Sequence, residues 1–164
     1  MVHRLAKAND FKAVYDLYMD EYANAYLTYD PMSKEAFKPI YESVLSTQTL
    51  YVVEQNGEVV ATYRLIPKTD RQKHTVYLGG FTIKDTSRRK GLASQILSEI
   101  KAHCQENKKI RMELTVDVDN MAAIALYKKA GFETEGIVKK SYRLSKTNRF
   151  YDEYLMALLL DDNG

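Results

Sequence analysis

The sequence predicts an α/β fold with a mixed, mostly antiparallel sheet of about seven strands and about four helices. Asn56-Gly57, between two apolar runs, is a strong signal for a two-residue β-hairpin. An amphipathic segment over 91–106 between two strand-like segments indicates one parallel crossover, because parallel strands need such a connection. The predicted strands are Val2–Leu5, Leu50–Gln55, Glu58–Ile66, His74–Ile83, Ile110–Val116, Phe132–Leu144 and Arg149–Leu159.

Four helices complete the predicted order. Aromatic and aliphatic side chains at helical spacing predict a first helix over roughly 10–25, with Asp10 as its N-cap. A second apolar stripe follows Ser33, where Pro39 predicts either a kink or a later start, because proline removes a backbone hydrogen bond. The third helix begins at Gly91, and Asn120 is placed to cap a fourth helix that runs through Ala130.

Size and composition favour one ordinary globular domain over residues 1–164. The net charge of +2 lacks the basic excess of a dedicated nucleic-acid binder, so we expect no nucleic-acid partner. Cys104 is the single cysteine, which excludes an internal disulfide. No signal peptide or membrane span is recognisable, which makes the cytoplasm the expected location and a membrane partner unexpected. The three histidines are scattered, so no metal site is predicted.

The segment Arg88–Ala93 is the chemical centre of the sequence. It lies at a strand-to-helix junction, where backbone N–H groups lack partners and the helix carries a partial positive charge. Gly91 lets the backbone approach a phosphate closely, and three basic residues precede it. Two interpretations fit the hexamer alone: an anion site, or a basic solvated loop. Its position at the junction favours the anion site, and the glycine patterns of dinucleotide and nucleoside-triphosphate sites are absent.

Two separate stretches resemble the GNAT superfamily of N-acetyltransferases. Phe81-Thr82-Ile83 followed by Arg88-Arg89-Lys90-Gly91-Leu92-Ala93 is similar to its core motif, V-x-V and then [QR]-x-x-G-x-[GA], with Ala93 in place of the last glycine. The stretches 112–120 and 125–132 resemble a second signature, L-x-V-x-x-x-N followed by A-x-x-L-Y-x-x-x-G-F. The closing segment Tyr151–Met156 is similar to the last strand of many bacterial members.

The resemblance implies acetyl-CoA as cofactor, lying in a V-shaped opening between two splayed parallel strands, 74–83 and 110–116. The backbone of Phe81 and Ile83 would bind the pantetheine arm, N–H groups from Arg89 to Ser94 the pyrophosphate, and the Asn120 amide the end of the pantetheine. The residues that it assigns to the cofactor are Phe81, Thr82, Ile83, Arg88, Arg89, Lys90, Gly91, Leu92, Ala93, Ser94, Asn120 and Tyr127.

Acetyl transfer to an amine needs a proton donor for the thiolate, a donor for the oxyanion and an unprotonated amine. Tyr127 suits the first role, since a phenol stays protonated at neutral pH; by spacing alone it would merely pack its helix, and the resemblance favours catalysis. Glu113 either relays a proton through water or is a structural carboxylate. Cys104 falls on an apolar helical stripe and is expected in the core, so direct attack by the amine is preferred to an acetylated cysteine.

The acceptor is the least readable part. The residues expected to contact it are Glu21, Tyr22, Tyr26, Tyr29, Asp152 and Glu153, although tyrosines at helical spacing are also typical of a core. The resemblance implies transfer of acetyl to a primary amine of a small molecule, amino acid, polyamine or protein. A CoA-binding sensor or scaffold without catalysis is the alternative, and a homodimer is expected only by analogy with the family.

Overall fold

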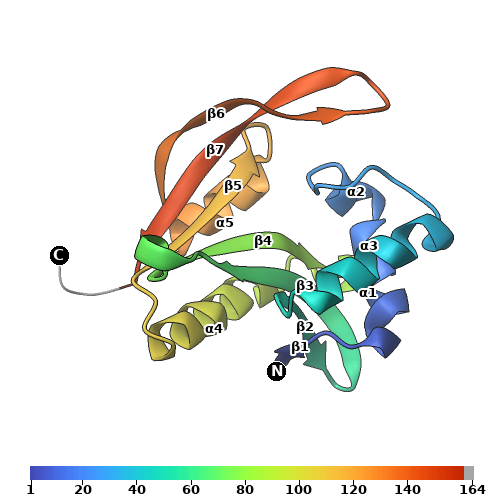
Figure 1. Ribbon diagram of the computed structural model, residues 1–164, viewed down its shortest axis with the longest axis horizontal. Helices are drawn as coiled ribbons and strands as arrows, with labels where there is room; N and C mark the ends of the chain where they lie inside the picture. Colours follow the sequence, from blue (N-terminus) through green and yellow to red (C-terminus); the bar gives the residue numbers. More distant parts are fainter. Residues whose placement is uncertain (161–164) are drawn as a thin grey trace. The chain divides into compact units, whose positions relative to one another are not determined.

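The computed structural model describes residues 1–160, which contain seven strands and five α-helices (Figure 1). The strands are β1 (Val2–Leu5), β2 (Leu50–Gln55), β3 (Glu58–Pro67), β4 (Thr75–Ile83), β5 (Arg111–Asp117), β6 (Glu133–Leu144) and β7 (Arg149–Leu159). The α-helices are α1 (Phe11–Tyr18), α2 (Glu21–Asn24), α3 (Lys34–Ser46), α4 (Leu92–Glu106) and α5 (Met121–Lys129). The sheet order is β1-β2-β3-β4-β5-β7-β6, and its β4–β5 pair is parallel, which confirms the predicted mixed sheet.

The chain divides into two compact units, each described by itself. The first unit comprises Met1–Leu65 and Gly79–Arg88. The second comprises Ile66–Leu78 and, within the described chain, residues 89–160. Strand β4 therefore contributes its first residues to the second unit and its last residues to the first.

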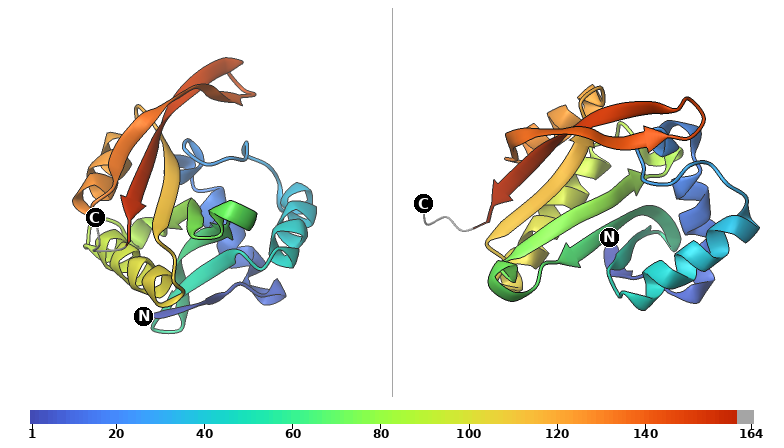
Figure 2. Two further views of the ribbon diagram at one scale, coloured as in Figure 1. Left: turned by 60° about the vertical axis from the view of Figure 1, so that its left-hand side comes forward. Right: turned by 45° about the horizontal axis from the view of Figure 1, so that its top comes forward.

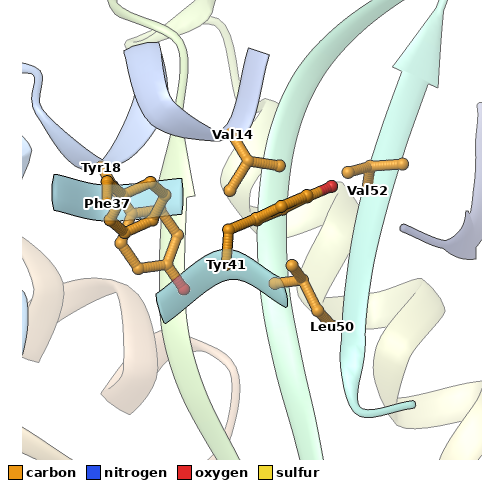
Figure 3. Packing of buried hydrophobic residues seen from close by; sticks show 6 residues of the cluster. All are labelled: Val14, Tyr18, Phe37, Tyr41, Leu50 and Val52. Carbon is orange, nitrogen blue, oxygen red and sulfur yellow. The ribbon is translucent and has the colours of Figure 1, made fainter. Parts of the chain in front are cut away.

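The first unit carries the predicted hairpin and an aromatic core. Asn56 and Gly57 have φ angles of 53° and 77°, the left-handed pair that a tight two-residue hairpin turn needs. Antiparallel β1, β2 and β3 are joined through ladders between β1 and β2 and between β2 and β3. Helices α1 and α3 pack on this unit, and Figure 3 shows the core cluster made by their inward side chains and by β2. Its members are Val14, Tyr18, Phe37, Tyr41, Leu50 and Val52.

One helix prediction in this unit was wrong, and one of the two alternatives for another helix is excluded. The continuous helix over 10–25 is interrupted, because Asp20 leaves the helical conformation and its side chain accepts a hydrogen bond from the Ala23 N–H at 2.9 Å, which starts α2 afresh. Helix α3 does not start late. Ser33 caps it through the Ala36 N–H at 3.3 Å, and the helix runs through Pro39.

The second unit is built from the parallel crossover and the C-terminal hairpin. Helix α4 joins β4 to β5, and the parallel ladder consists of three residue pairs, from Thr75–Arg111 to Tyr77–Glu113. Strand β7 pairs antiparallel with β5 on one side and with β6 on the other. Figure 2 shows α4 and α5 on one side of β5 and β7. Met112 lines a cavity together with residues of α4 and α5, so by strand alternation Leu114 and Val116 face the same side of β5, and Glu113, Thr115 and Asp117 face the other side.

No helix within residues 1–160 is both long enough and apolar enough to span a membrane.

Candidate active site

The start of α4 is shaped as an anion site. Gly91 is the N-cap of α4 and has a φ of 77°, and because it lacks a side chain it does not cap the N–H groups of the first turn. Two residues earlier, Arg89 has a φ of 59°. Backbone that alternates into the left-handed region turns successive N–H groups toward one point, and the helix dipole adds positive potential there. A Cβ placed on Gly91 would meet no atom within 4 Å, so this backbone is open to a ligand. The residues Arg89, Lys90, Gly91, Leu92, Ala93 and Ser94 therefore fit the predicted pyrophosphate site, which stays a prediction.

Arg88, predicted to contact the cofactor, has its guanidinium occupied within the first unit. Its Nε donates to the Ile83 carbonyl at 2.9 Å, its Nη1 donates to Asp85 at 3.1 Å, and its Nη2 donates to Asp20. Its guanidinium carbon also lies 4.9 Å from the ring centroid of Tyr22. These contacts favour a structural role for Arg88, and its assignment to the cofactor stays a prediction.

The end of β4 contains Phe81, Thr82 and Ile83, the predicted pantetheine strand. Thr82 and Ile83 are buried, and Phe81 is half-buried. A feature that the sequence reasoning missed precedes them: Gly80 has a φ of 56° inside a strand, and a Cβ there would lie 2.5 Å from the Tyr18 hydroxyl oxygen. Paired glycines at 79 and 80 in an otherwise apolar strand were the available signal, because glycine inside a strand marks a bulge or a close approach.

Helix α5 holds the two residues of the second signature. The Asn120 side-chain oxygen accepts from the Ala123 N–H at 3.2 Å, which confirms the predicted cap and leaves the amide nitrogen as the donor for a ligand. Tyr127 is buried, and its ring packs edge-on against Phe132 with centroids 5.6 Å apart. Burial, and secondarily the neighbouring Tyr77, raises the pKa of Tyr127 well above its usual value. Its phenol is therefore held in the protonated form that a general acid requires.

Glu113, predicted as a base, is a buried carboxylate with two cationic partners. It forms an ion pair with Lys68 and accepts from the Arg111 Nε at 3.2 Å, while Arg111 also binds Glu135. Burial alone would raise the pKa of Glu113, but hydrogen bonds from Lys68 and Arg111 outweigh it and the pKa is lowered. A carboxylate stabilised in this way is a weak base, so these contacts favour the structural alternative.

The predicted acceptor residues of the first unit separate into two groups. Tyr22 and Tyr26 are 55% and 39% exposed, and their rings make an edge contact with centroids 6.1 Å apart. Glu21 is also exposed, in the first turn of α2. Tyr29, in contrast, packs its ring against Tyr18 and Phe37 and belongs with the aromatic core. Three of the four residues are thus accessible to an acceptor.

In the second unit, Asp152 and Glu153 are held by strand β6. Asp152 accepts from the Lys140 N–H at 2.8 Å, and Glu153 accepts from the Ser141 hydroxyl. A neighbouring pair escaped the sequence reasoning: the Tyr142 hydroxyl donates to the buried Asp117. No sequence signal joins these two, because they lie 25 positions apart on strands that both pair with β7.

Cys104 is buried on α4, and burial raises the pKa of its thiol to about 11. The burial confirms the prediction that Cys104 is a core residue, and the raised pKa keeps its thiol protonated at neutral pH.

Comparison with known proteins relates this arrangement to one family. The Acetyltransferase (GNAT) family matches residues 11–132. An L-amino acid N-acetyltransferase, AaaT, of Escherichia coli (strain K12) is 36% identical over 104 residues. That match spans 62% of this chain and 62% of the relative's length.

Solved structures share the fold at low sequence identity. Spermidine N-acetyltransferase from Vibrio cholerae, in complex with CoA and spermine, has a TM-score of 0.82 at 19% identity, covering 97% of this chain and 95% of that one. The protein yncA from Salmonella typhimurium, solved with its cofactor acetyl-CoA, has a TM-score of 0.76 at 22% identity, covering 100% of this chain and 96% of that one.

Proposed function

The chain belongs to the Acetyltransferase (GNAT) family, and from this premise we propose that it is an acetyl-CoA-dependent N-acetyltransferase acting on a primary amine. The observation that carries the proposal is the start of α4, where Arg89 and Gly91 both take left-handed angles and no side chain caps the helix. This backbone suits a pyrophosphate. The glycine patterns of dinucleotide and nucleoside-triphosphate sites are absent from the sequence.

Acetyl-CoA supplies a thioester whose acetyl group is the group transferred. The α4 N–H groups would bind its pyrophosphate, and the backbone of Phe81 and Ile83 its pantetheine arm. Tyr127 would give its proton to the departing sulfur as the amine nitrogen forms the new bond to carbon and the C–S bond breaks. Burial raises the pKa of Tyr127 and so keeps the phenol protonated at neutral pH, the form that can donate to the sulfur as negative charge develops there. The proton that the amine loses goes to water or to a carboxylate.

We propose direct attack by the amine rather than transfer through a cysteine. Cys104 is buried and its thiol is held protonated, which supports this choice. As acceptors we propose the amines of amino acids first and polyamines second. The relative of 36% identity bears the name of an L-amino acid N-acetyltransferase, and that name supports the first class.

A thiol-release assay with acetyl-CoA tests the activity. Amine sets of three kinds, L-amino acids, polyamines and short peptides with free N-termini, are offered separately, and the acetylated product is identified by mass spectrometry. We expect thiol release above the hydrolysis background with at least one set, and no release when the amine is replaced by its N-acetylated form. Micromolar CoA binding without release from any amine would instead support the non-catalytic sensor.

We propose further that residues 1–164 act as one N-acetyltransferase domain and that this domain works in the cytoplasm. Its proposed acceptor is a small molecule or a peptide, and we propose neither a nucleic-acid nor a membrane partner. A homodimer is a separate proposal. Sedimentation of the whole chain over a concentration series tests it, and a single species of about the monomer mass of 18.9 kDa would contradict it.

A further inference from the structure

One guanidinium connects three segments of the first unit. Arg88 donates to the Ile83 carbonyl at the end of β4, to Asp85 in the following turn and to Asp20 at the start of α2, and it lies over the Tyr22 ring. Its side chain is only 19% exposed. Arginine holds several acceptors at once through its planar fork and stacks on an aromatic face, which lysine does not reproduce.

Asp20 is shared between Arg88 and the helix that it caps. Its carboxylate accepts from the Ala23 N–H at 2.9 Å and from Arg88. Burial would raise the pKa of Asp20, but the hydrogen bonds from Arg88 and Ala23 outweigh it, so the pKa is lowered and the carboxylate is ionised at neutral pH. The negative charge of Asp20 is thus compensated by Arg88, while the side-chain oxygen of Asp20 caps the first turn of α2.

Helix α2 depends on such anchors because it has four residues, too few to be stable alone. Its far end is fixed by the buried Asn24, whose amide donates to the Tyr18 carbonyl at 2.9 Å and to the Tyr29 carbonyl at 3.0 Å. Its near end has the Asp20–Arg88 pair. Glu21 and Tyr22, both proposed acceptor residues, lie directly after that near end.

We propose that Arg88 is a positioning residue that couples the acceptor segment α2 to the end of β4, so that binding of acetyl-CoA stabilises the anchored α2 against local opening and positions it for the amine. The inference rests on the proposed function, because β4 and the residues after Arg88 are taken as the cofactor segment. A ligand that binds the Ile83 backbone and the residues after Arg88 limits the motion of the Arg88 guanidinium, because that guanidinium donates to the Ile83 carbonyl. The guanidinium in turn limits the motion of α2, because it contacts Asp20 and Tyr22 at the start of that helix. Coupling between two sites of one protein commonly amounts to about 5–150-fold in affinity.

Hydrogen exchange of the whole chain, with and without CoA, tests the coupling without any acceptor. The reporters are the amides of α2 and its exit, where Asn24 donates to the Asp20 carbonyl at 2.8 Å and Tyr26 donates to the Ala23 carbonyl at 3.0 Å. In the wild type we expect saturating CoA to slow their exchange by about fivefold or more.

Asp20→Asn is the decisive variant, because asparagine still caps a helix while its charge is lost. We expect it to bind CoA within about threefold of wild type by calorimetry and to show less than about twofold protection of α2. We expect Arg88→Lys to give the same result as Asp20→Asn, in both CoA affinity and protection of α2. Glu58→Gln is the matched control: it removes the exposed Glu58–Lys84 ion pair of the same unit, and full protection of α2 is expected.

A kinetic split provides the second readout once the thiol assay has identified an amine. Asp20→Asn should raise the KM for the amine by about tenfold and change kcat by less than about threefold, whereas a purely structural defect would lower the melting temperature and leave the KM for the amine unchanged. CoA binding that leaves α2 exchange unaltered in the wild type would overturn the inference and spare the proposed function. No CoA binding at all would overturn both.

Discussion

Replacing Gly80 by alanine tests whether the close approach of β4 to Tyr18 shapes the cofactor strand. Gly80 has a φ of 56°, a region in which a Cβ costs about 1–2 kcal/mol. The new Cβ would also lie 2.5 Å from the Tyr18 hydroxyl oxygen. Tyr18 cannot swing away, because it is 5% exposed and its ring packs against Phe37 with centroids 5.7 Å apart. Overpacking of this kind costs about 1–3 kcal/mol, so we expect Gly80→Ala to destabilise by about 2–5 kcal/mol in total.

Tyr18→Phe separates the two contributions. Without the hydroxyl, the nearest atom to the new Cβ is the ring carbon Cζ at 3.4 Å, an ordinary contact. The double variant Gly80→Ala/Tyr18→Phe should therefore cost only the backbone strain, about 1–2 kcal/mol, and the two substitutions should be non-additive by about 1–3 kcal/mol.

Urea unfolding followed by circular dichroism measures these free energies. Gly136→Ala is the control, because Gly136 in β6 lacks a positive φ and a Cβ there would meet no atom within 4 Å; its effect should stay within about 1 kcal/mol. A neutral Gly80→Ala, or a double variant whose cost equals the sum of the single costs, would refute the reasoning.

Three further predictions concern the loop, the acid and one ion pair. Gly91→Glu should weaken CoA binding by at least about 100-fold in calorimetry, because a carboxylate would face the pyrophosphate; unchanged affinity would remove the pyrophosphate from the start of α4. Tyr127→Phe should lower kcat by about 100-fold or more with a KM for acetyl-CoA within about threefold, and equal turnover would assign the acid elsewhere. Asp10→Asn keeps an acceptor for the Lys7 N–H but loses the charge facing Arg4, at a cost of about 1.5–3 kcal/mol. Because hydrogen bonds chiefly from Arg4 lower the pKa of folded Asp10, that difference should be constant well above pH 3.8, its ordinary value, and shrink as the pH falls below it; a pH-independent difference would contradict the assignment.

The sequence predicted those parts of the fold that local chemistry determines. The hairpin at Asn56-Gly57, the cap at Asn120 and all seven strands follow from turn residues and from alternation, which act over a few neighbouring positions. Asp20 shows where local pattern misleads: the apolar spacing continues through it, but its side chain caps a new helix instead of continuing the old one.

The candidate site was predictable where its chemistry is backbone chemistry. Gly91 has a φ of 77°, a left-handed conformation that glycine adopts without steric cost and that fits the close backbone approach expected of it. The partners of Arg88 and Glu113 were not predictable, since ion pairs such as Arg88–Asp20, 68 positions apart, depend on which side chains the fold brings within reach. Arg88 accordingly looked like a phosphate ligand, and Glu113 like a possible base.

The contacts of Arg88 and Glu113 have the same consequence for mechanism. Arg88 and Glu113 are each held by at least two described partners, so neither is available to leave its place without disrupting a network. The proposed contacts of acetyl-CoA are then the backbone at the start of α4 and the phenol of Tyr127, and neither group is proposed to change its charge when the cofactor binds. An enzyme built this way should bind acetyl-CoA with little dependence on pH between 6 and 8, and its pH profile should then report the ionisation of the acceptor amine.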